Sequence, residues 1–215
     1  MVIALPKGRI AEDVLDIFSK IFNEEFKFEN RKLILKKADF TFLNVRNWDV
    51  VTYVENQAAD IGVVGFDVLE ELNANLLELY DLNLGKCRVS VAGIKGDESY
   101  KNKVEIKVAT KLENIAKKYF SKRGIPTKII KLNGSIELAP LIGLSDLIVD
   151  IVETGNTLKE NGLEEKEVIM HSSARIVANK NSFLTKKNKI LKLIEKIKEV
   201  NGDWVIFRGR RTFFR

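Results

Sequence analysis

Short apolar runs alternate with amphipathic segments along the whole sequence, and this alternation most limits what the chain can fold into. The first apolar run, residues 2–5, is followed by a segment at 11–22 whose apolar residues recur every three or four positions. The run predicts a buried strand, and the recurrence predicts a helix with one apolar face. Repetition of this order is typical of an α/β protein with mostly parallel strands.

Two series of such units are expected. The first has strands at 2–5, 32–35, 40–45, 60–64 and 88–92, and helices at 11–22, 49–56 and 66–72. The second has strands at 104–109, 127–132 and 147–152, and helices at 112–123 and 135–143. Two further runs at 168–171 and 174–179 precede a last helix at 184–200. No Pro/Gly-rich linker separates the series, so we expect two closely joined lobes.

Composition excludes several classes of protein. At 215 residues and 45% hydrophobic, the chain can bury a sizeable core. No apolar run approaches the roughly 20 residues of a membrane span, and signal-peptide features are missing, so we expect a cytoplasmic protein without a membrane segment. Cys87 and His171 are the only residues of their types; we expect packing or surface roles for them, and no zinc site.

The formal net charge of +6 has two interpretations. It indicates either affinity for a polyanion or a lysine-rich solvated surface. Many of the lysines fall in the last expected helix, around a narrow apolar stripe, which favours the solvated surface. Nucleic-acid binding through this region remains a weak alternative, because no recognised motif accompanies the charge.

An internal echo indicates where ligands bind. Residues 59–69 and 145–158 each read as a buried strand, a glycine-containing turn and a helix. Ligands of open α/β sheets bind outside the carboxyl ends of strands, so two lobes with such loops facing each other would form a cleft. Chance similarity between short strand-turn-helix units also accounts for the echo.

The segment at 149–158 carries the clearest chemical signal. Gly155 permits a tight turn, while backbone amides and the hydroxyls of Thr154 and Thr157 can converge on a phosphate at a helix start. Asp150 and Glu153 suit ribose hydroxyls, or Mg²⁺ held through water. Carboxylates followed by Thr-Gly-x-Thr fit a sugar phosphate; an ordinary turn with Thr157 as a helix cap is the alternative.

Cations collect at other strand ends. Lys7 and Arg9 flank Gly8 after the first strand, where they can meet a polyphosphate. The alternative is that both are only solvated charges of a surface loop. Arg46 follows another strand onto the same rim. Arg31 precedes a strand and would have to reach inward; a surface salt bridge is the default for both.

The second series has candidates of its own. Lys111 ends a strand there, and Ser135 begins a helix whose first amides can bind an anion.

The sequence resembles the ATP phosphoribosyltransferase family over nearly its whole length. The resemblance rests on six segments in order: 5–10 (LPKGRI), 49–69, 85–88 (GKCR), 108–111 (VATK), 131–141 (KLNGSIELAPL) and 144–163. It implies a two-lobed fold of the type II periplasmic-binding-protein kind with the active site in the inter-lobe cleft. The expected lobes are residues 1–93 with 170–215, and residues 94–169.

The resemblance also implies a reaction and its residues. Phosphoribosyl would pass from phosphoribosyl pyrophosphate (PRPP) to N1 of the ATP adenine, the first step of histidine biosynthesis. Arg9 and Arg31 are implied to meet the pyrophosphate and triphosphate charge as catalytic groups. The remaining expected assignments are PRPP binding by Asp150, Glu153, Thr154, Gly155, Asn156 and Thr157, and ATP binding by Lys7, Gly8, Arg9, Arg46, Lys111 and Ser135.

Cofactor and partner expectations follow from the same resemblance. Mg²⁺ is expected to be bound by substrate, with no metal site built from protein side chains. The length matches short family members, which lack a C-terminal histidine-binding domain and assemble with a histidyl-tRNA-synthetase-like regulatory subunit; a homodimer of catalytic subunits is also expected. The Phe- and Arg-rich tail at 201–215 departs from the family pattern. A non-catalytic small-molecule sensor of the same fold is the alternative function.

Overall fold

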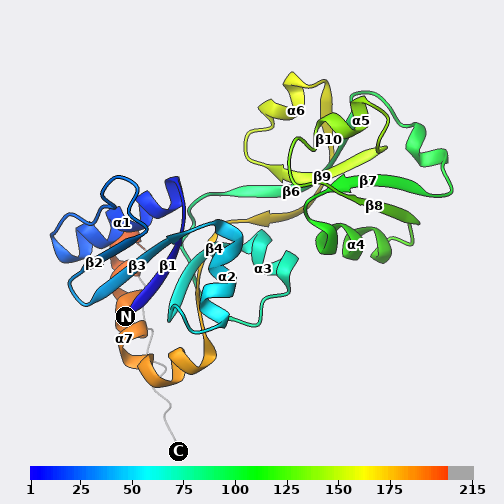
Figure 1. Ribbon diagram of the computed structural model, residues 1–215. Coiled ribbons are helices and arrows are strands. Elements are labelled where there is room, and N and C mark those ends of the chain that lie inside the picture. Colours follow the sequence, from blue (N-terminus) through cyan, green and yellow to red (C-terminus); the bar gives the residue numbers. More distant parts are fainter. Residues whose placement is uncertain (203–215) are drawn as a thin grey trace, which may run out of the picture.

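The chain folds into two α/β lobes joined by a pair of strands (Figure 1). This computed structural model describes residues 1–202. From residue 203 onward, the tail singled out in the sequence lies outside the described residues.

The first lobe is built on a six-stranded sheet. Its order is β2-β3-β1-β4-β11-β5, in which β1 pairs in parallel with β3 and β4. The strands are β1 (Val2–Pro6), β2 (Ile34–Lys37), β3 (Phe40–Val45), β4 (Ile61–Gly65), β5 (Leu77–Asp81) and β11 (Ala174–Ala178). Since β3, β1 and β4 are parallel, their carboxyl ends meet at one edge of the sheet, where Lys7 and Arg46 follow.

Helices cover both faces of this sheet. One face packs against α1 (Arg9–Phe22) and α7 (Lys180–Asn201), around the buried Phe18 and Phe42. The other face packs against α2 (Asn47–Glu55) and α3 (Phe66–Leu72), around a valine-rich cluster. Helix α1 forms as its periodicity predicts, with Val14, Leu15 and Phe18 all buried.

The second lobe is built on a five-stranded sheet of order β10-β6-β9-β7-β8. Its strands are β6 (Cys87–Ile94), β7 (Ile106–Thr110), β8 (Thr127–Lys131), β9 (Leu147–Val152) and β10 (Leu163–Ser172). Helix α4 (Glu113–Lys122) packs on one face. The short helices α5 (Leu138–Leu141) and α6 (Asn156–Glu160) flank the other, and a 3-10 turn at Ser99–Asn102 links β6 to β7.

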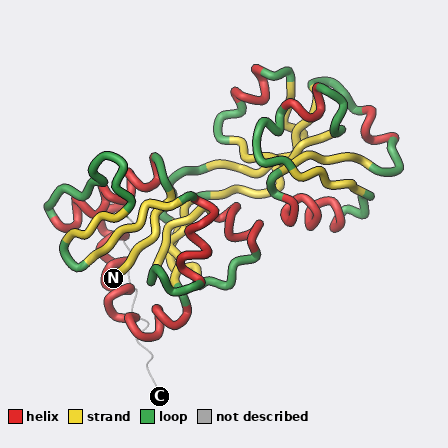
Figure 2. The backbone as a smooth tube through the Cα atoms, in the orientation of Figure 1, coloured by secondary structure: helices red, strands yellow, loops and turns green. Residues whose placement is uncertain are grey.

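Strands β6 and β10 pair with each other and connect the lobes, as Figure 2 shows. Both belong to the five-stranded sheet, so the chain leaves the first sheet after β5 and returns to it at β11. The expected lobe boundaries were 93/94 and 169/170, whereas the pairing of β6 and β10 divides the sheets near residues 85 and 173. In the sequence, β6 directly follows the units of the first series, so it was assigned to the first lobe. In the structure, its hydrogen bonds to β9 make it part of the second sheet.

Three local expectations differ from the structure. Four of the nine strand pairings are parallel, so the expected mostly parallel arrangement holds only for β3-β1-β4 in the first sheet and for β9-β7-β8, at one side of the second. The helix expected at 135–143 shortens to α5, because Ser135 takes a positive φ of 49° and Gly143 one of 72°. Strand β5, half-buried beside β11, was not predicted.

Candidate active site

The two lobes touch through Arg9 and Glu153 at the carboxyl edges of their sheets. Arg9 Nη2 lies 2.6 Å from Glu153 Oε1, although 144 residues separate them in sequence. Arg9 is the first residue of α1, and Glu153 follows β9 directly. The structure therefore brings the Lys-Gly-Arg loop against the predicted phosphate loop, with both side chains more than half exposed to solvent.

Gly8 sets the direction in which Arg9 leaves the sheet. It has φ 99° and ψ −155°, a conformation that residues with a Cβ rarely adopt, and its carbonyl accepts the first hydrogen bonds of α1. The Lys7 amide donates to the Val45 carbonyl at 2.8 Å, which places Lys7 beside Arg46 on the same rim.

The loop from Glu153 to Thr157 has the geometry of an anion cradle. Gly155, at φ 83°, immediately precedes α6 and has no side chain to cap it, and the Asn156 amide donates a long hydrogen bond of 3.4 Å to the Thr154 hydroxyl. Thr154, Asn156 and Thr157 are exposed, while Leu158 is buried and anchors the helix. Apart from that contact, the exposed start of α6 presents backbone amides and the Thr157 hydroxyl to solvent.

Arg88 on β6 supports this loop, although it is not among the predicted site residues. Its Nη1 donates to the Glu153 carbonyl at 3.1 Å, and its Nε donates to Glu165 Oε2 at 2.8 Å. In the antiparallel ladder Arg88 lies opposite Val152, the last residue of β9. Arg88 ends the GKCR segment at 85–88, one of the six segments of the family resemblance, but only the strand register shows that it contacts Glu153.

Asp150 lies inside the second lobe with Lys111 as its counter-charge. Lys111 Nζ is 3.5 Å from Asp150 Oδ1, and the Asp150 side chain is 16% exposed. Burial raises the pKa of Asp150 and outweighs the opposing effect of Lys111; nearby Glu137 raises the pKa further. Lys111 is held in place by the buried Thr110, whose hydroxyl donates to the Val149 carbonyl at 2.6 Å and accepts from the Leu112 amide.

A cleft of about 610 Å³ lies between the lobes, and neither Arg9 nor the loop at 153–157 is among the residues that line it. Arg46 and Lys111, both predicted ATP-binding residues, line it from opposite lobes. Its other lining residues are Trp48, Asp49, Glu71 and Leu72 from the first lobe, and Glu113, Asn114, Lys131 and Asn133 from the second.

Two of the predicted site residues, Arg31 and Ser135, are less closely connected to the others. Arg31 is exposed in the loop before β2; the neighbouring Leu33 carbonyl accepts from the Asn44 amide at 2.8 Å, which puts this loop near the rim that carries Arg46. Ser135 is exposed just beyond Asn133. Within residues 1–202, no hydrogen bond or ion pair joins either residue to the rest of the predicted site.

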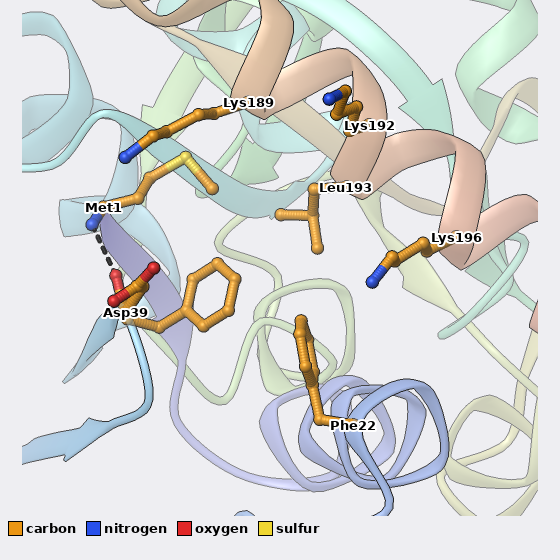
Figure 3. A pocket seen from close by; sticks show the side chains of 8 residues that line it. Met1, Phe22, Asp39, Lys189, Lys192, Leu193 and Lys196 are labelled. Carbon is orange, nitrogen blue, oxygen red and sulfur yellow. Dashed lines mark hydrogen bonds between the residues drawn. The ribbon is translucent and has the colours of Figure 1, made fainter.

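A second, smaller groove lies at the opposite edge of the first sheet (Figure 3). It measures about 230 Å³ between α1, β1 and α7, with an apolar floor that includes Phe22 and Leu193. Three lysines rim it, and the Met1 ammonium donates to the Asp39 carbonyl at 2.7 Å. Its position at the amino end of β1 separates it from Arg9, which lies beyond the carboxyl end.

Two α/β lobes joined by a pair of strands, with a cleft between them, are typical of the type II periplasmic-binding-protein fold. The periplasmic aliphatic sulphonate binding protein SsuA from Escherichia coli has the same fold, with a TM-score of 0.62 at 12% identity over 94% of this chain and 68% of that chain. The sequence profile of the ATP phosphoribosyltransferase (HisG) family matches residues 46–199. The chain belongs to this family.

Individual relatives agree with the profile. ATP phosphoribosyltransferase of Campylobacter fetus subsp. fetus is 59% identical over 93% of this chain and 98% of its own length. That of Sulfurovum sp. is 60% identical over 93% and 97%. A chain of the ATP phosphoribosyl transferase (HisG:HisZ) complex from Thermotoga maritima superposes with a TM-score of 0.82 at 38% identity, over 95% of this chain and 100% of that chain.

The expected fold class, family and enzyme class are thereby confirmed. The chain is a transferase of the pentosyltransferase type, and its reaction is the first step of histidine biosynthesis. These relatives support the enzyme and not the non-catalytic sensor. Within residues 1–202, no helix is both long and apolar enough to cross a bilayer.

Proposed function

We propose that the inter-lobe cleft aligns PRPP on the second lobe with ATP on the first, and transfers phosphoribosyl to adenine N1. The observation that carries this assignment is the Arg9–Glu153 contact of 2.6 Å, which joins the cationic loop to the phosphate loop. In the reaction N1 attacks C1 of the ribose, the bond from C1 to the pyrophosphate oxygen breaks, and pyrophosphate leaves with the electron pair.

On the second lobe, the loop at 154–157 receives the 5′-phosphate through backbone amides and threonine hydroxyls. Asp150 and Glu153 accept hydrogen bonds from the ribose hydroxyls. Glu153 is paired with Arg9 in the structure, so this ion pair has to break when PRPP binds. The carboxylate then accepts from the ribose hydroxyls, and the guanidinium donates to the pyrophosphate.

On the first lobe, Lys7, Gly8 and Arg46 meet the triphosphate of ATP, with Lys111 and Ser135 completing the site from the opposite side. Arg9 and Arg31 stabilise the negative charge that grows on departing pyrophosphate. No nucleophilic side chain is required, because the adenine nitrogen attacks directly. Alignment of the two anionic substrates is the main contribution of the protein.

Mg²⁺ fits this site as an ion carried by the substrate. The described residues contain no group of three or more His, Cys, Asp or Glu side chains that could hold a metal. Mg²⁺ commonly binds one or two carboxylates together with substrate phosphates and water, and Asp150 and Glu153 are the carboxylates beside the phosphate loop. When bound, the ion would neutralise charge on the pyrophosphate.

We further infer that the chain functions with a regulatory subunit and as a homodimer of catalytic subunits. The support for the first is that the similar Thermotoga maritima chain is part of a HisG:HisZ complex. Sedimentation of the chain alone, and mixed with such a subunit, tests both inferences.

The reaction is tested by incubating the chain with ATP, PRPP and Mg²⁺, with pyrophosphatase to remove product, and measuring phosphoribosyl-ATP. Arg9→Ala is expected to lower kcat by about 10²- to 10³-fold, as loss of a charge-stabilising donor does in other enzymes. Because Arg9 is exposed, the Arg9→Ala variant is expected to have the same unfolding midpoint as the wild-type chain.

The matched control is Arg123→Ala, which removes another exposed, ion-paired arginine, one that stacks on Tyr119 in the second lobe. It should retain activity. A well-folded wild-type chain that forms no adduct with or without its regulatory subunit, or an Arg9→Ala variant as active as wild type, would contradict the proposal.

A further inference from the structure

Glu71 lines the cleft and connects the two lobes. It is only 5% exposed, at the end of α3 in the first lobe. Its Oε1 accepts from the Asn114 amide and its Oε2 from the Ile115 amide, each at 2.9 Å. Its backbone carbonyl accepts from Asn114 Nδ2 at 2.8 Å.

These hydrogen bonds cap a helix of the other lobe. The first amides of a helix have no partners within it, and a capping side chain normally comes from the residue just before the helix. In α4 that residue is Leu112, which cannot cap, and no local side chain replaces it. The cap is supplied instead by a carboxylate 43 residues earlier in the chain, which also complements the positive end of the helix dipole.

The capped end of α4 lies close in sequence to the predicted site. Lys111, two residues before α4, points to Asp150, and Glu71, Asn114 and Lys111 all line the same cleft as Arg46. A shift of α4 against α3 would therefore move Lys111 relative to Arg46.

Another buried carboxylate of α3, Asp67, accepts from the Ser172 hydroxyl at the end of β10 at 2.7 Å, but that contact does not reach α4. Two ion pairs between the lobes are more exposed than the Glu71 cap. The Arg9 and Glu153 side chains are 64% and 57% exposed, and the proposed substrates compete for both. Lys118 and Glu70 are 3.3 Å apart with side chains 58% and 38% exposed. Exposed pairs such as these hold geometry weakly. The buried Glu71 cap can persist while substrates bind and leave.

We propose that Glu71 is a positioning residue that fixes the two lobes at the distance and angle required for transfer between PRPP and ATP. It acts through α4 and does not itself bind the reacting atoms. The inference rests on the proposed function for its kinetic consequence, whereas its structural consequence is independent of turnover.

The test compares Glu71→Gln with Glu70→Gln, a change of the neighbouring exposed glutamate that also reaches the second lobe. Glutamine has nearly the same shape as glutamate, but it lacks the charge and presents one acceptor and one donor to the two amides. In Glu71→Gln we expect kcat to fall about 10- to 100-fold, because small misplacements of aligned substrates have effects of this size. The KM for PRPP should stay unchanged, since its phosphate loop lies within the second lobe.

A spin-label distance measurement supplies the readout that does not require turnover. Labels at Lys20→Cys in α1 and Lys159→Cys in α6, in a Cys87→Ser background, report the separation of the lobes. Glu71→Gln should broaden or shift this distance distribution, while Glu70→Gln should match wild type. A folded Glu71→Gln chain with the wild-type distance distribution, or with wild-type kcat, overturns the inference; an inactive wild-type chain counts against the proposed reaction alone.

Discussion

The Asp150 carboxylate is a charge that the fold holds largely away from water. Burial raises its pKa, so the folded chain binds this proton more tightly than the unfolded chain does. The free energy of unfolding consequently falls as the pH rises through the raised pKa, and stays lower above it. A buried carboxylate that lowers stability is understandable where it binds substrate, and our proposal gives Asp150 that role.

Asp150→Asn is expected to stabilise the free enzyme at pH 7, because the amide avoids the cost of burying a charge. The gain should shrink as the pH falls toward and below 3.8, the ordinary pKa of the group, because the carboxyl is then increasingly protonated in both states. Urea unfolding at pH 7 and at the lowest pH where both chains remain folded measures this. Affinity for PRPP should fall about 10- to 100-fold, as for loss of a charged hydrogen-bond partner. A variant less stable than wild type at pH 7 would show that Lys111 outweighs burial.

Element ends, more than element interiors, place the functional groups. Arg9 opens α1 beside Gly8, whose positive φ sets the direction of the backbone, and Lys111 follows β7 beside Thr110, whose side-chain hydroxyl accepts from the Leu112 amide. The interior of α1 contributes the apolar face that fixes the helix on the sheet. The direction of its first turn depends on Gly8.

Gly8→Ala tests that dependence. Apart from its two neighbours in the chain, no described residue has an atom within 4 Å of the position that a Cβ would occupy, so the cost comes from backbone conformation. We expect the free energy of unfolding to fall by about 1–3 kcal/mol, the usual range for such strain. Gly134→Ala is the control, because its Cβ would also meet open space but its φ is not positive. Equal effects in denaturant unfolding would refute the conformational explanation.

At the scale of the whole molecule, the site exists because two sheets present their carboxyl edges to one cleft. Each lobe has its own apolar clusters on both faces of its sheet, so each contributes a preformed half of the site. The phosphate loop lies wholly in the second lobe. If PRPP binds to this loop, as we propose, it can bind before ATP contacts are complete, and its binding should stabilise the folded chain.

PRPP with Mg²⁺ at 100 times its Kd should raise the free energy of unfolding by about 2.7 kcal/mol, as mass action requires. Thr154→Ala combined with Thr157→Ala should lose most of this gain at the same ligand concentration. Thr127→Ala removes a threonine of the same lobe whose hydroxyl bonds the Ile125 carbonyl at 3.0 Å, and should keep the gain. Thermal or chemical unfolding with and without PRPP provides the comparison; equal gains in all three chains would exclude the loop as the phosphate site.

Much of this architecture is local and therefore predictable from the sequence. The periodicity of residues 11–22 and the run at 147–152 predict α1 and β9, because burial of one apolar face or run depends on neighbouring residues. Gly155 between two threonines likewise predicts the turn before α6, since turn chemistry is also short-range.

Tertiary structure alone decided which distant residues meet. It assigned β6 to the second sheet, paired Arg9 with Glu153, placed Arg88 beneath the phosphate loop and brought Glu71 to the start of α4. A strand pairs with whichever neighbour gives the best packing of the whole sheet, and a buried carboxylate takes whichever amides the packed helices present. Neither the strand pairing nor the partner of the carboxylate can be predicted from the residues next to it in the sequence.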